Sequence, residues 1–186
     1  MVKKNACVFI SGEGTNFKAL YKYSKEKNFP IDIKLLVTSD INARGVIFAK
    51  KVGIPYLVYK NNKLSNEFKI LNTIKQYKIS IICLAGFMRI LSSNFIKVFG
   101  KKIINIHPSL LPKFKGLNTF KRVLQNKEKK TGCTIHFVNN KLDGGKIILQ
   151  KFFYIGNSDN KKTLKIKTQK LEHTSYCHAI IKVFGK

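Results

Sequence analysis

The sequence predicts an α/β protein with a doubly wound, mostly parallel sheet of about seven strands and helices on both faces. Short apolar runs of strand length, rich in Ile, Val and Phe, alternate with longer amphipathic stretches through most of the 186 residues. This alternation is typical of a parallel sheet built from right-handed β-α-β crossovers. The sequence contains no internal repeat, no low-complexity linker and no break in composition. We therefore expect one domain over residues 1–186.

Strands are expected where a run of apolar, β-branched or aromatic residues is bounded by turn residues. The runs cover residues 6–11, 31–39, 55–60, 80–86, 102–107, 131–138 and 146–155. The last two runs follow one another directly, separated by NNKLDGG. The glycine pair in this connection permits a tight return of the chain.

Helices are expected between the earlier strands and near the end of the chain. Residues 15–28, 43–53 and 64–78 carry apolar side chains at spacings of three and four. This spacing places the apolar side chains on one face of a helix. Gly53 or a lysine-rich turn ends these stretches. A last helix is expected from about residue 160 to residue 183.

The chain is strongly basic but also strongly apolar. It has 36 Lys and Arg residues against 9 Asp and Glu residues, a formal net charge of +27, and 44% hydrophobic residues. This apolar content excludes a disordered, collagen-like or coiled-coil chain. All but three of the cations are lysines, spread along the whole chain, whereas nucleic-acid sites favour clustered arginine. A nucleic-acid partner is therefore not expected, although the positive field would attract an anionic substrate.

The sequence also indicates the compartment and the state of the cysteines. No apolar run reaches the ~18 residues of a membrane helix, and the start of the chain turns polar too soon for a signal peptide. We therefore expect a soluble, cytoplasmic protein with no membrane partner. The widely spaced cysteines, without a CxxC pair, are expected to be reduced and buried, with no metal site. They are Cys7, Cys83, Cys133 and Cys177.

The loop after the first expected strand has the composition of a phosphate site. Ligands of open α/β sheets bind at the carboxyl ends of the strands, where a loop meets a helix N-terminus. There the sequence reads SGEGTN over residues 11–16, without the GK[ST] of a Walker loop or the third glycine of a dinucleotide loop. Gly14, Thr15 and Asn16 are candidates to bind a single phosphate. The alternative is an ordinary turn with Thr15 or Asn16 as helix N-cap.

A second group of polar residues follows the strand expected at residues 102–107. Asn105 and His107 are two positions apart, so in a strand both side chains project from the same face. Asp143 lies in the sequence LDGG, where the glycines permit close approach of a ligand or of backbone. An amide, an imidazole and a carboxylate can stabilise an oxyanion and transfer protons. A structural histidine and a turn-forming asparagine are the alternative interpretation.

Four collinear blocks of the sequence resemble the phosphoribosylglycinamide formyltransferases, the folate-dependent enzymes of purine synthesis. They are SGEGTN at 11–16, LAGFMRIL at 84–91, NIHPSLLP at 105–112, and TGCTIHFV at 131–138 with LDGG at 142–145. The resemblance extends from about residue 6 to residue 184. It implies transfer of a formyl group from the co-substrate 10-formyltetrahydrofolate to the amine of glycinamide ribonucleotide. It further implies a Rossmann-like formyltransferase fold, no metal, and a monomer or homodimer.

The resemblance also implies roles for individual residues. The catalytic residues would be Asn105, His107 and Asp143. The phosphate and ribose of the ribonucleotide would contact Gly14, Thr15, Asn16, Gln169, Lys170, Leu171 and Glu172. Folate would contact Lys63, Met88, Arg89, Ile90, Leu91, Asn105, Asn139, Asn140, Lys141, Leu142 and Asp143.

The chemistry of formyl transfer suits the three catalytic side chains. Attack of an amine on the formyl carbon creates an oxyanion, to which the Asn105 amide and a protonated His107 can donate hydrogen bonds. A carboxylate beside an imidazole favours the imidazolium, so Asp143 is expected to keep His107 charged near neutral pH and to help relay protons. His136, in the strand expected at 131–138, is expected to be a pocket-wall or structural residue.

The sequence departs from the family pattern in one loop. Lys115 and Asn118 stand where many of these enzymes have Pro and His, so their loop can close differently over folate.

Three rival functions are also considered. Formyl transfer to an initiator aminoacyl-tRNA would use a related trio of residues, but such enzymes carry an extra RNA-binding domain and lack this phosphate loop. Hydrolysis of formyl-folate is a second enzymatic rival, but that family typically carries an extra N-terminal regulatory domain. A non-enzymatic, basic nucleic-acid-binding protein is the third alternative.

Overall fold

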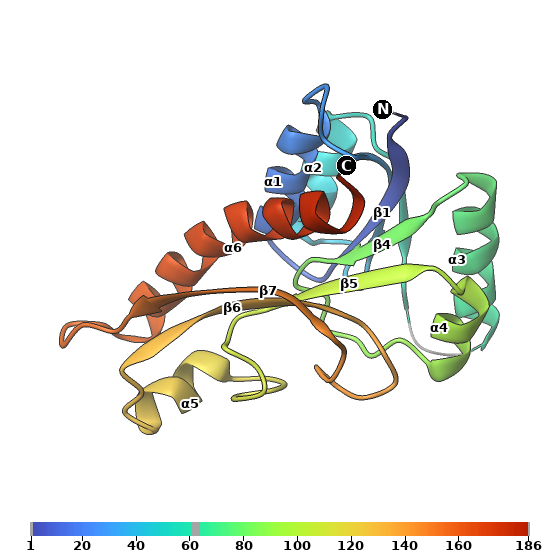
Figure 1. Cartoon of the computed structure of the whole chain (residues 1–186). Helices are drawn as coiled ribbons and strands as arrows, with labels where there is room; N and C mark the ends of the chain where they lie inside the picture. Colours follow the sequence, from blue (N-terminus) through green and yellow to red (C-terminus); the bar gives the residue numbers. More distant parts are fainter. Residues whose placement is uncertain (1, 61–63, 186) are drawn as a thin grey trace.

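The computed structural model describes residues 2–60 and 64–185, which form a seven-stranded sheet flanked by helices (Figure 1). The strand order is β3-β2-β1-β4-β5-β6-β7. The strands are β1 (Lys4–Ile10), β2 (Ile31–Thr38), β3 (Tyr56–Val58), β4 (Ile81–Leu84), β5 (Lys102–His107), β6 (Lys130–Phe137) and β7 (Ile147–Tyr154). The first five strands pair in parallel, whereas β6 and β7 are antiparallel to their neighbours. The predicted α/β class and the mostly parallel sheet are confirmed.

Four of the helices were expected from the sequence, and two short ones were not. The helices are α1 (Thr15–Ser24), α2 (Arg44–Lys51), α3 (Leu64–Gln76), α4 (Ser93–Phe99), α5 (Thr119–Gln125) and α6 (Lys161–Phe184). The apolar spacing did not predict α4 and α5, each of seven residues. Two helical turns repeat an apolar position too few times for the pattern to be recognised.

Two apolar cores, one on each face of the sheet, hold the helices in place. Successive side chains of a strand point to opposite faces. In β1, Ala6, Val8 and Ile10 therefore join the core under α1, α2 and α6, whereas Cys7 and Phe9 join the core under α3 and α4. Figure 1 shows these two groups of helices on either side of the strands. The prediction of helices on both faces is confirmed.

The strand order changes direction at the carboxyl ends of β1 and β4, the position at which folds of this type have a ligand crevice. In the sheet, β2 and β3 lie on one side of β1, whereas β4 and β5, which follow them in the chain, lie on the other side. The loops after β1 and β4 leave the sheet in opposite directions, and ligands of such folds bind between them. Helix α6 is fixed close by, because the buried Tyr176 hydroxyl lies 3.0 Å from Leu84 O and 2.9 Å from Ile104 O.

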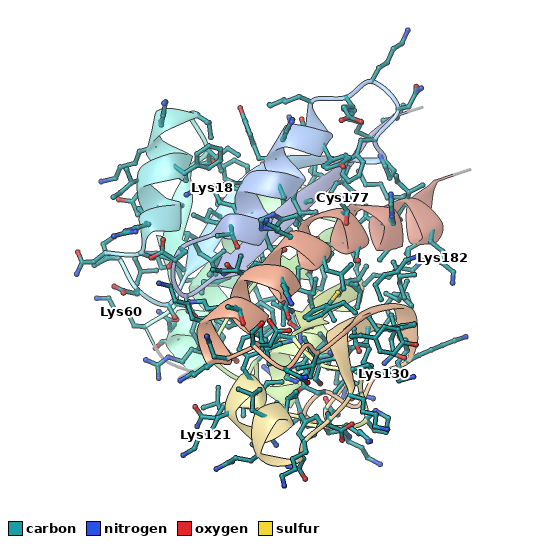
Figure 2. The ribbon with its side chains drawn as sticks, turned by 90° about the vertical axis from the view of Figure 1, so that its left-hand side faces the viewer. Lys18, Lys60, Lys121, Lys130, Cys177 and Lys182 are labelled. Carbon is teal, nitrogen blue, oxygen red and sulfur yellow. The ribbon has the colours of Figure 1, made fainter. Side chains whose placement is uncertain are left out.

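The surface lysines are dispersed over the fold. Figure 2 labels five exposed lysines in different parts of the fold, four of them in separate helices or strands and one in the loop after β3: Lys18, Lys121, Lys130 and Lys182, and Lys60. This distribution is typical of a solvated surface, in agreement with the interpretation of the sequence. Among the residues described by the structure, no helix is both long and apolar enough to cross a membrane.

The four cysteines are buried and free, as the sequence predicts. Burial raises the pKa of the Cys83, Cys133 and Cys177 thiols to about 12. A thiol with so high a pKa carries almost no thiolate at neutral pH and is therefore unreactive. The cysteines contribute to the core and not to the chemistry of the molecule.

Candidate functional site

An amide, an imidazole and a carboxylate meet at the carboxyl end of β5. Ile104 and Ile106 point into the core shared with α6, so the alternate residues Asn105 and His107 project from the opposite face. Asp143 reaches them from the loop between β6 and β7. Its Oδ2 lies 3.3 Å from His107 Nδ1, and its Oδ1 lies 3.4 Å from Asn105 Nδ2. The three side chains therefore converge on one point, as the sequence analysis expects.

The backbone around Asp143 is shaped to deliver its carboxylate. Asp143 has a φ of 46°, in the left-handed region, and a side chain on Gly145 would overlap the Phe137 carbonyl. Burial acts to raise the pKa of Asp143, but hydrogen bonds with His136 and the Gly116 N–H, together with nearby His107, outweigh burial and lower this pKa to about 2. Asp143 is therefore fully ionised at neutral pH.

The two ring nitrogens of His107 contact different groups: Nδ1 faces Asp143, and Nε2 faces Phe114. The His107 side chain is 8% exposed. Nε2 lies 2.9 Å from Phe114 O, and because a carbonyl only accepts, Nε2 carries a hydrogen. Burial lowers the pKa of His107, and the Phe114 carbonyl and Asp143 offset this effect only in part. The prediction that Asp143 keeps His107 charged near neutral pH stays a prediction, because desolvation of the ring acts against the imidazolium whereas the contact of Nδ1 with the Asp143 carboxylate favours it.

The loop that carries the two departures, Lys115 and Asn118, closes over these side chains. Phe114 contributes its carbonyl to His107, and the Gly116 N–H donates to Asp143 Oδ2 over 2.8 Å. Phe114 and Asn118 both have positive φ, 57° and 56°. The loop thus occupies the His107 Nε2–H, a donor that an incoming carbonyl oxygen could otherwise use.

The glycine-rich loop after β1 leads into a helix N-terminus that has no side-chain cap. Gly14, with a φ of 66°, is the N-cap of α1, and it provides no side chain to accept the N–H groups of the first turn. The alternative of Thr15 or Asn16 as N-cap is therefore wrong. The first turn of α1 contains no acidic residue. Free N–H groups and the helix dipole favour a bound phosphate here.

One residue of α6 contacts the start of α1 directly. Asn16 Nδ2 donates to Glu172 Oε2 over 2.8 Å, and both side chains are buried. Burial raises the pKa of Glu172 to about 7, although the bond from Asn16 acts to lower it. Asn16 Oδ1 is buried without a partner among the described residues. An acceptor and a readily protonated carboxyl at this place suit a ligand with hydroxyl groups.

The other residues of the expected ribonucleotide segment are not brought to the loop in the same way. Lys170 and Leu171 line a separate cavity of about 420 Å³ between α6 and β7, together with Phe153 and Tyr154. Gln169 is half-buried. Successive residues of a helix are rotated by about 100°, so four in a row cannot all face one ligand.

The expected folate contacts lie on two exposed segments near the trio. After β4, Met88 and Ile90 are 67% and 72% exposed, whereas Leu91 is buried at 6%. Arg89 is also exposed. Between β6 and β7, the loop is shaped by the Asn139 side chain, which donates to Gly144 O and accepts from Lys141 N. Asn140, Lys141 and Leu142 are exposed on this loop, and Lys63 lies outside the described residues.

Comparison with known proteins agrees with this geometry. A protein-family model described as formyl transferase matches residues 4–180. The chain belongs to the formyltransferase family. The catalytic trio of a formyltransferase, which the resemblance implied, thus falls on side chains that meet in space.

Similar formyltransferases are found among both sequences and solved structures. The phosphoribosylglycinamide formyltransferase of Haemophilus influenzae is 36% identical over 177 residues, covering 93% of this chain and 84% of that protein. The enzyme of the same name from Bacillus subtilis is 34% identical over 186 residues, covering 98% and 95%. A crystal structure of phosphoribosylglycinamide formyltransferase from Brucella melitensis has a TM-score of 0.92 and 37% identity, covering 99% of this chain and 96% of that chain.

A longer relative contains the same region. The trifunctional purine biosynthetic protein adenosine-3 of Gallus gallus is 38% identical over 182 residues. The match covers 96% of this chain but only 18% of that protein. The similarity to the trifunctional protein therefore concerns one region of it.

Three residues of this formyltransferase site were missed or undervalued in the sequence. His136 lies opposite Asn105 in the β5–β6 pairing, and its Nε2 is 3.2 Å from Asn105 Nδ2 and 3.6 Å from Asp143 Oδ1. Gly45 packs against Gly14, and its N–H donates to Gly12 O over 3.1 Å. Only the strand register reveals the first contact, and only helix packing reveals the second. Phe114, the third, faces His107 because of the loop conformation.

Other features of the formyltransferase lie away from the trio. A cavity of about 750 Å³ at the amino ends of β1 and β5 is lined by Lys4, Lys102 and Phe184, among others. Within residues 2–60 and 64–185, no group of three or more His, Cys, Asp and Glu side chains is arranged to hold a metal ion.

Proposed function

We propose that this formyltransferase moves the formyl group of 10-formyltetrahydrofolate to the amine of glycinamide ribonucleotide, a step of purine biosynthesis. The observation that carries the proposal is the convergence of Asn105, His107 and Asp143 beside an uncapped helix N-terminus that suits a phosphate. Relatives that share most of their length with this chain bear the name of this activity. Dispersed lysines and free backbone N–H groups support a small anionic substrate over a polynucleotide.

The reaction needs donors for an oxyanion and a path for one proton. The amine nitrogen bonds to the formyl carbon, and the carbonyl oxygen becomes negative. His107 Nε2–H donates to this oxygen in place of the Phe114 carbonyl, and the Asn105 amide turns one N–H from Asp143 towards it. The bond from carbon to the folate nitrogen then breaks. The amine loses a proton and the folate nitrogen gains one, through His107 and a water held by Asp143.

The substrates occupy the two sides of the crevice. The ribonucleotide phosphate binds the N–H groups at Gly14, Thr15 and Asn16, and its ribose hydroxyls meet Asn16 and Glu172. Folate binds along 88–91 and against the loop 139–143, and Lys63 is added to these contacts by resemblance alone. Of the expected segment 169–172 only Glu172 is retained, because Lys170 and Leu171 line a separate cavity. We place the enzyme in the cytoplasm as a monomer or homodimer.

A direct assay separates this proposal from its rival. The purified protein is mixed with 10-formyltetrahydrofolate and either glycinamide ribonucleotide or charged initiator tRNA, and loss of the formyl group from folate is followed. Formyl transfer to the ribonucleotide and none to the tRNA is the expected result. Transfer to the tRNA alone would replace the proposal with the rival, and salt-sensitive RNA binding without any transfer would remove the enzyme interpretation.

Gly45→Ala should weaken ribonucleotide binding by disturbing the phosphate loop. A Cβ on Gly45 would overlap the Ile10 side chain and approach the Gly14 Cα, so either the loop or α2 must shift. Misplaced N–H groups lose charge-assisted hydrogen bonds, and we expect the KM for the ribonucleotide to rise about tenfold. Steady-state kinetics with each substrate varied in turn would measure it. A KM that rises only for folate would contradict the assignment of this loop.

Lys115→Pro should release His107 from the Phe114 carbonyl. A residue before proline is driven to an extended backbone, which is incompatible with the φ of 57° at Phe114. The Phe114 hydrogen bond raises the pKa of His107, so its loss should lower this pKa further in an NMR titration. Loss of this competing bond should lower the KM for 10-formyltetrahydrofolate about fivefold. Unchanged values of both quantities would show that the loop does not compete with substrate.

A further inference from the structure

The irregular segment from Phe87 to Ser92, here the 87–92 segment, presents its middle to solvent and is fixed at both ends. Met88 and Ile90 are 67% and 72% exposed. At the first end, Ser11 Oγ accepts the Met88 N–H over 2.7 Å. The Phe87 ring packs edge-on against Phe9 and Tyr59, with ring centroids 5.2 Å and 5.4 Å apart. The first end is thereby attached to the end of β1.

The second end is attached to a buried carboxylate. Glu67, in the first turn of α3, is 1% exposed. It accepts the Ser92 N–H over 3.2 Å at Oε1 and the Ser92 hydroxyl at Oε2. The Tyr59 hydroxyl also donates to Oε1, over 2.7 Å. Burying a carboxylate is costly unless hydrogen bonds compensate it, so these donors and Glu67 fix one another in position.

Ser92 passes this constraint on to the next helix. Its Oγ accepts the Phe95 N–H over 2.9 Å and is the N-cap of α4. The hydroxyl therefore has one role as acceptor, for α4, and one as donor, to Glu67. The point at which the 87–92 segment ends and α4 begins is determined by this double use of a single side chain.

We infer that Glu67 is a positioning residue for folate binding, which acts through Ser92 to hold the 87–92 segment in the conformation that receives folate. The inference rests on the proposed function, in which folate binds along 88–91. Glu67 itself touches no substrate in this view. Because the segment is irregular and its middle is exposed, the bonds at its ends determine the spacing and direction of its backbone groups. A segment whose backbone is already ordered binds its ligand more tightly, because binding does not have to restrict its conformations further.

A set of variants tests the inference through the two substrates separately. Glu67→Gln keeps the shape but loses the charge and one acceptor oxygen, and Ser92→Ala loses the donor. Each should raise the KM for 10-formyltetrahydrofolate about tenfold, with kcat and the KM for the ribonucleotide within about twofold of the parent. Ser92→Thr keeps the hydroxyl and should restore the parent KM. Ile74→Val is the matched control, since it shortens another buried side chain of α3 and leaves the hydrogen bonds between Glu67 and Ser92 in place.

Binding without turnover distinguishes failure of the inference from failure of the proposed function. Calorimetric titration with 5-formyltetrahydrofolate should show about tenfold weaker binding to Glu67→Gln than to the parent and to Ile74→Val. If the parent binds no folate and transfers no formyl group, the proposed function fails. If the parent does both and Glu67→Gln binds folate equally well, or if both KM values rise together, Glu67 is only structural and the inference is overturned.

Discussion

Asp143→Asn should lower kcat/KM about a thousandfold, on the order of 4 kcal/mol of barrier, while the fold is retained. The amide has the shape of the carboxylate and can still accept the Gly116 N–H. It cannot supply the negative charge that faces His107 Nδ1 at 3.3 Å, nor accept a proton during the transfer. Formyl-transfer kinetics with 10-formyltetrahydrofolate and the ribonucleotide would measure the loss, and circular dichroism would establish that the variant is folded.

The chain offers a matched control for this variant. Asp159 also accepts a backbone N–H, from Gly156, and its carboxylate lies 2.7 Å from Lys167 Nζ, but it lies before α6 and outside the trio. Hydrogen bonds with Lys167 and Gly156 lower its pKa to about 2, as for Asp143. Asp159→Asn should leave kcat/KM within about twofold of the parent. Near-normal activity of Asp143→Asn, or an equal loss in both variants, would remove Asp143 from the mechanism.

Glu172→Gln should make the protein more stable above neutral pH and less able to bind the ribonucleotide. Burial raises the pKa of Glu172 from 4.5 to about 7. Below pH 4.5 both folded and unfolded chains hold this proton. Between pH 4.5 and pH 7 the unfolded chain has lost the proton while the folded chain still holds it, so stability falls across this range, by about 3 kcal/mol in total, and levels off above pH 7. A neutral Gln avoids this loss.

The measurement is denaturant unfolding of both proteins at pH 5 and pH 8. The parent should lose stability between these values, and Glu172→Gln should lose about 3 kcal/mol less. The same variant should raise the KM for the ribonucleotide about tenfold, because an ionised carboxylate accepts ribose hydroxyls more strongly than an amide. An unchanged pH dependence of stability would show that Glu172 is not buried in the protonated form, and an unchanged KM would remove it from the ribose site.

Parts of the site could be predicted because they depend on local spacing. Asn105 and His107 share a face since a strand repeats every two residues. The glycine residues at 11–16 predict a loop between a strand and a helix, although the N-cap of α1 is Gly14 and not Thr15 or Asn16. The sequence indicates which residue types are available at the carboxyl edge of the sheet.

Other parts depend on contacts between residues far apart in the chain. His136 meets Asn105 only because β6 pairs with β5 in one particular register. Glu67 and Ser92 are 25 residues apart, and no pattern in either segment predicts their bond. The short helices α4 and α5 likewise depend on packing, because a two-turn helix is marginal by itself.

By itself, the sequence predicted the α/β class, the succession of strands and longer helices along the chain and the residue types of the proposed catalytic trio, because strand periodicity, turn residues and motif spacing are local properties of the chain. Only the tertiary structure shows which ionisable groups of the site are desolvated. Burial lowers the pKa of His107, although the neighbouring Asp143 acts to raise it, and burial raises the pKa of Glu172. The physical reason is that desolvation depends on everything packed around a group, whereas sequence spacing identifies only a few of its neighbours.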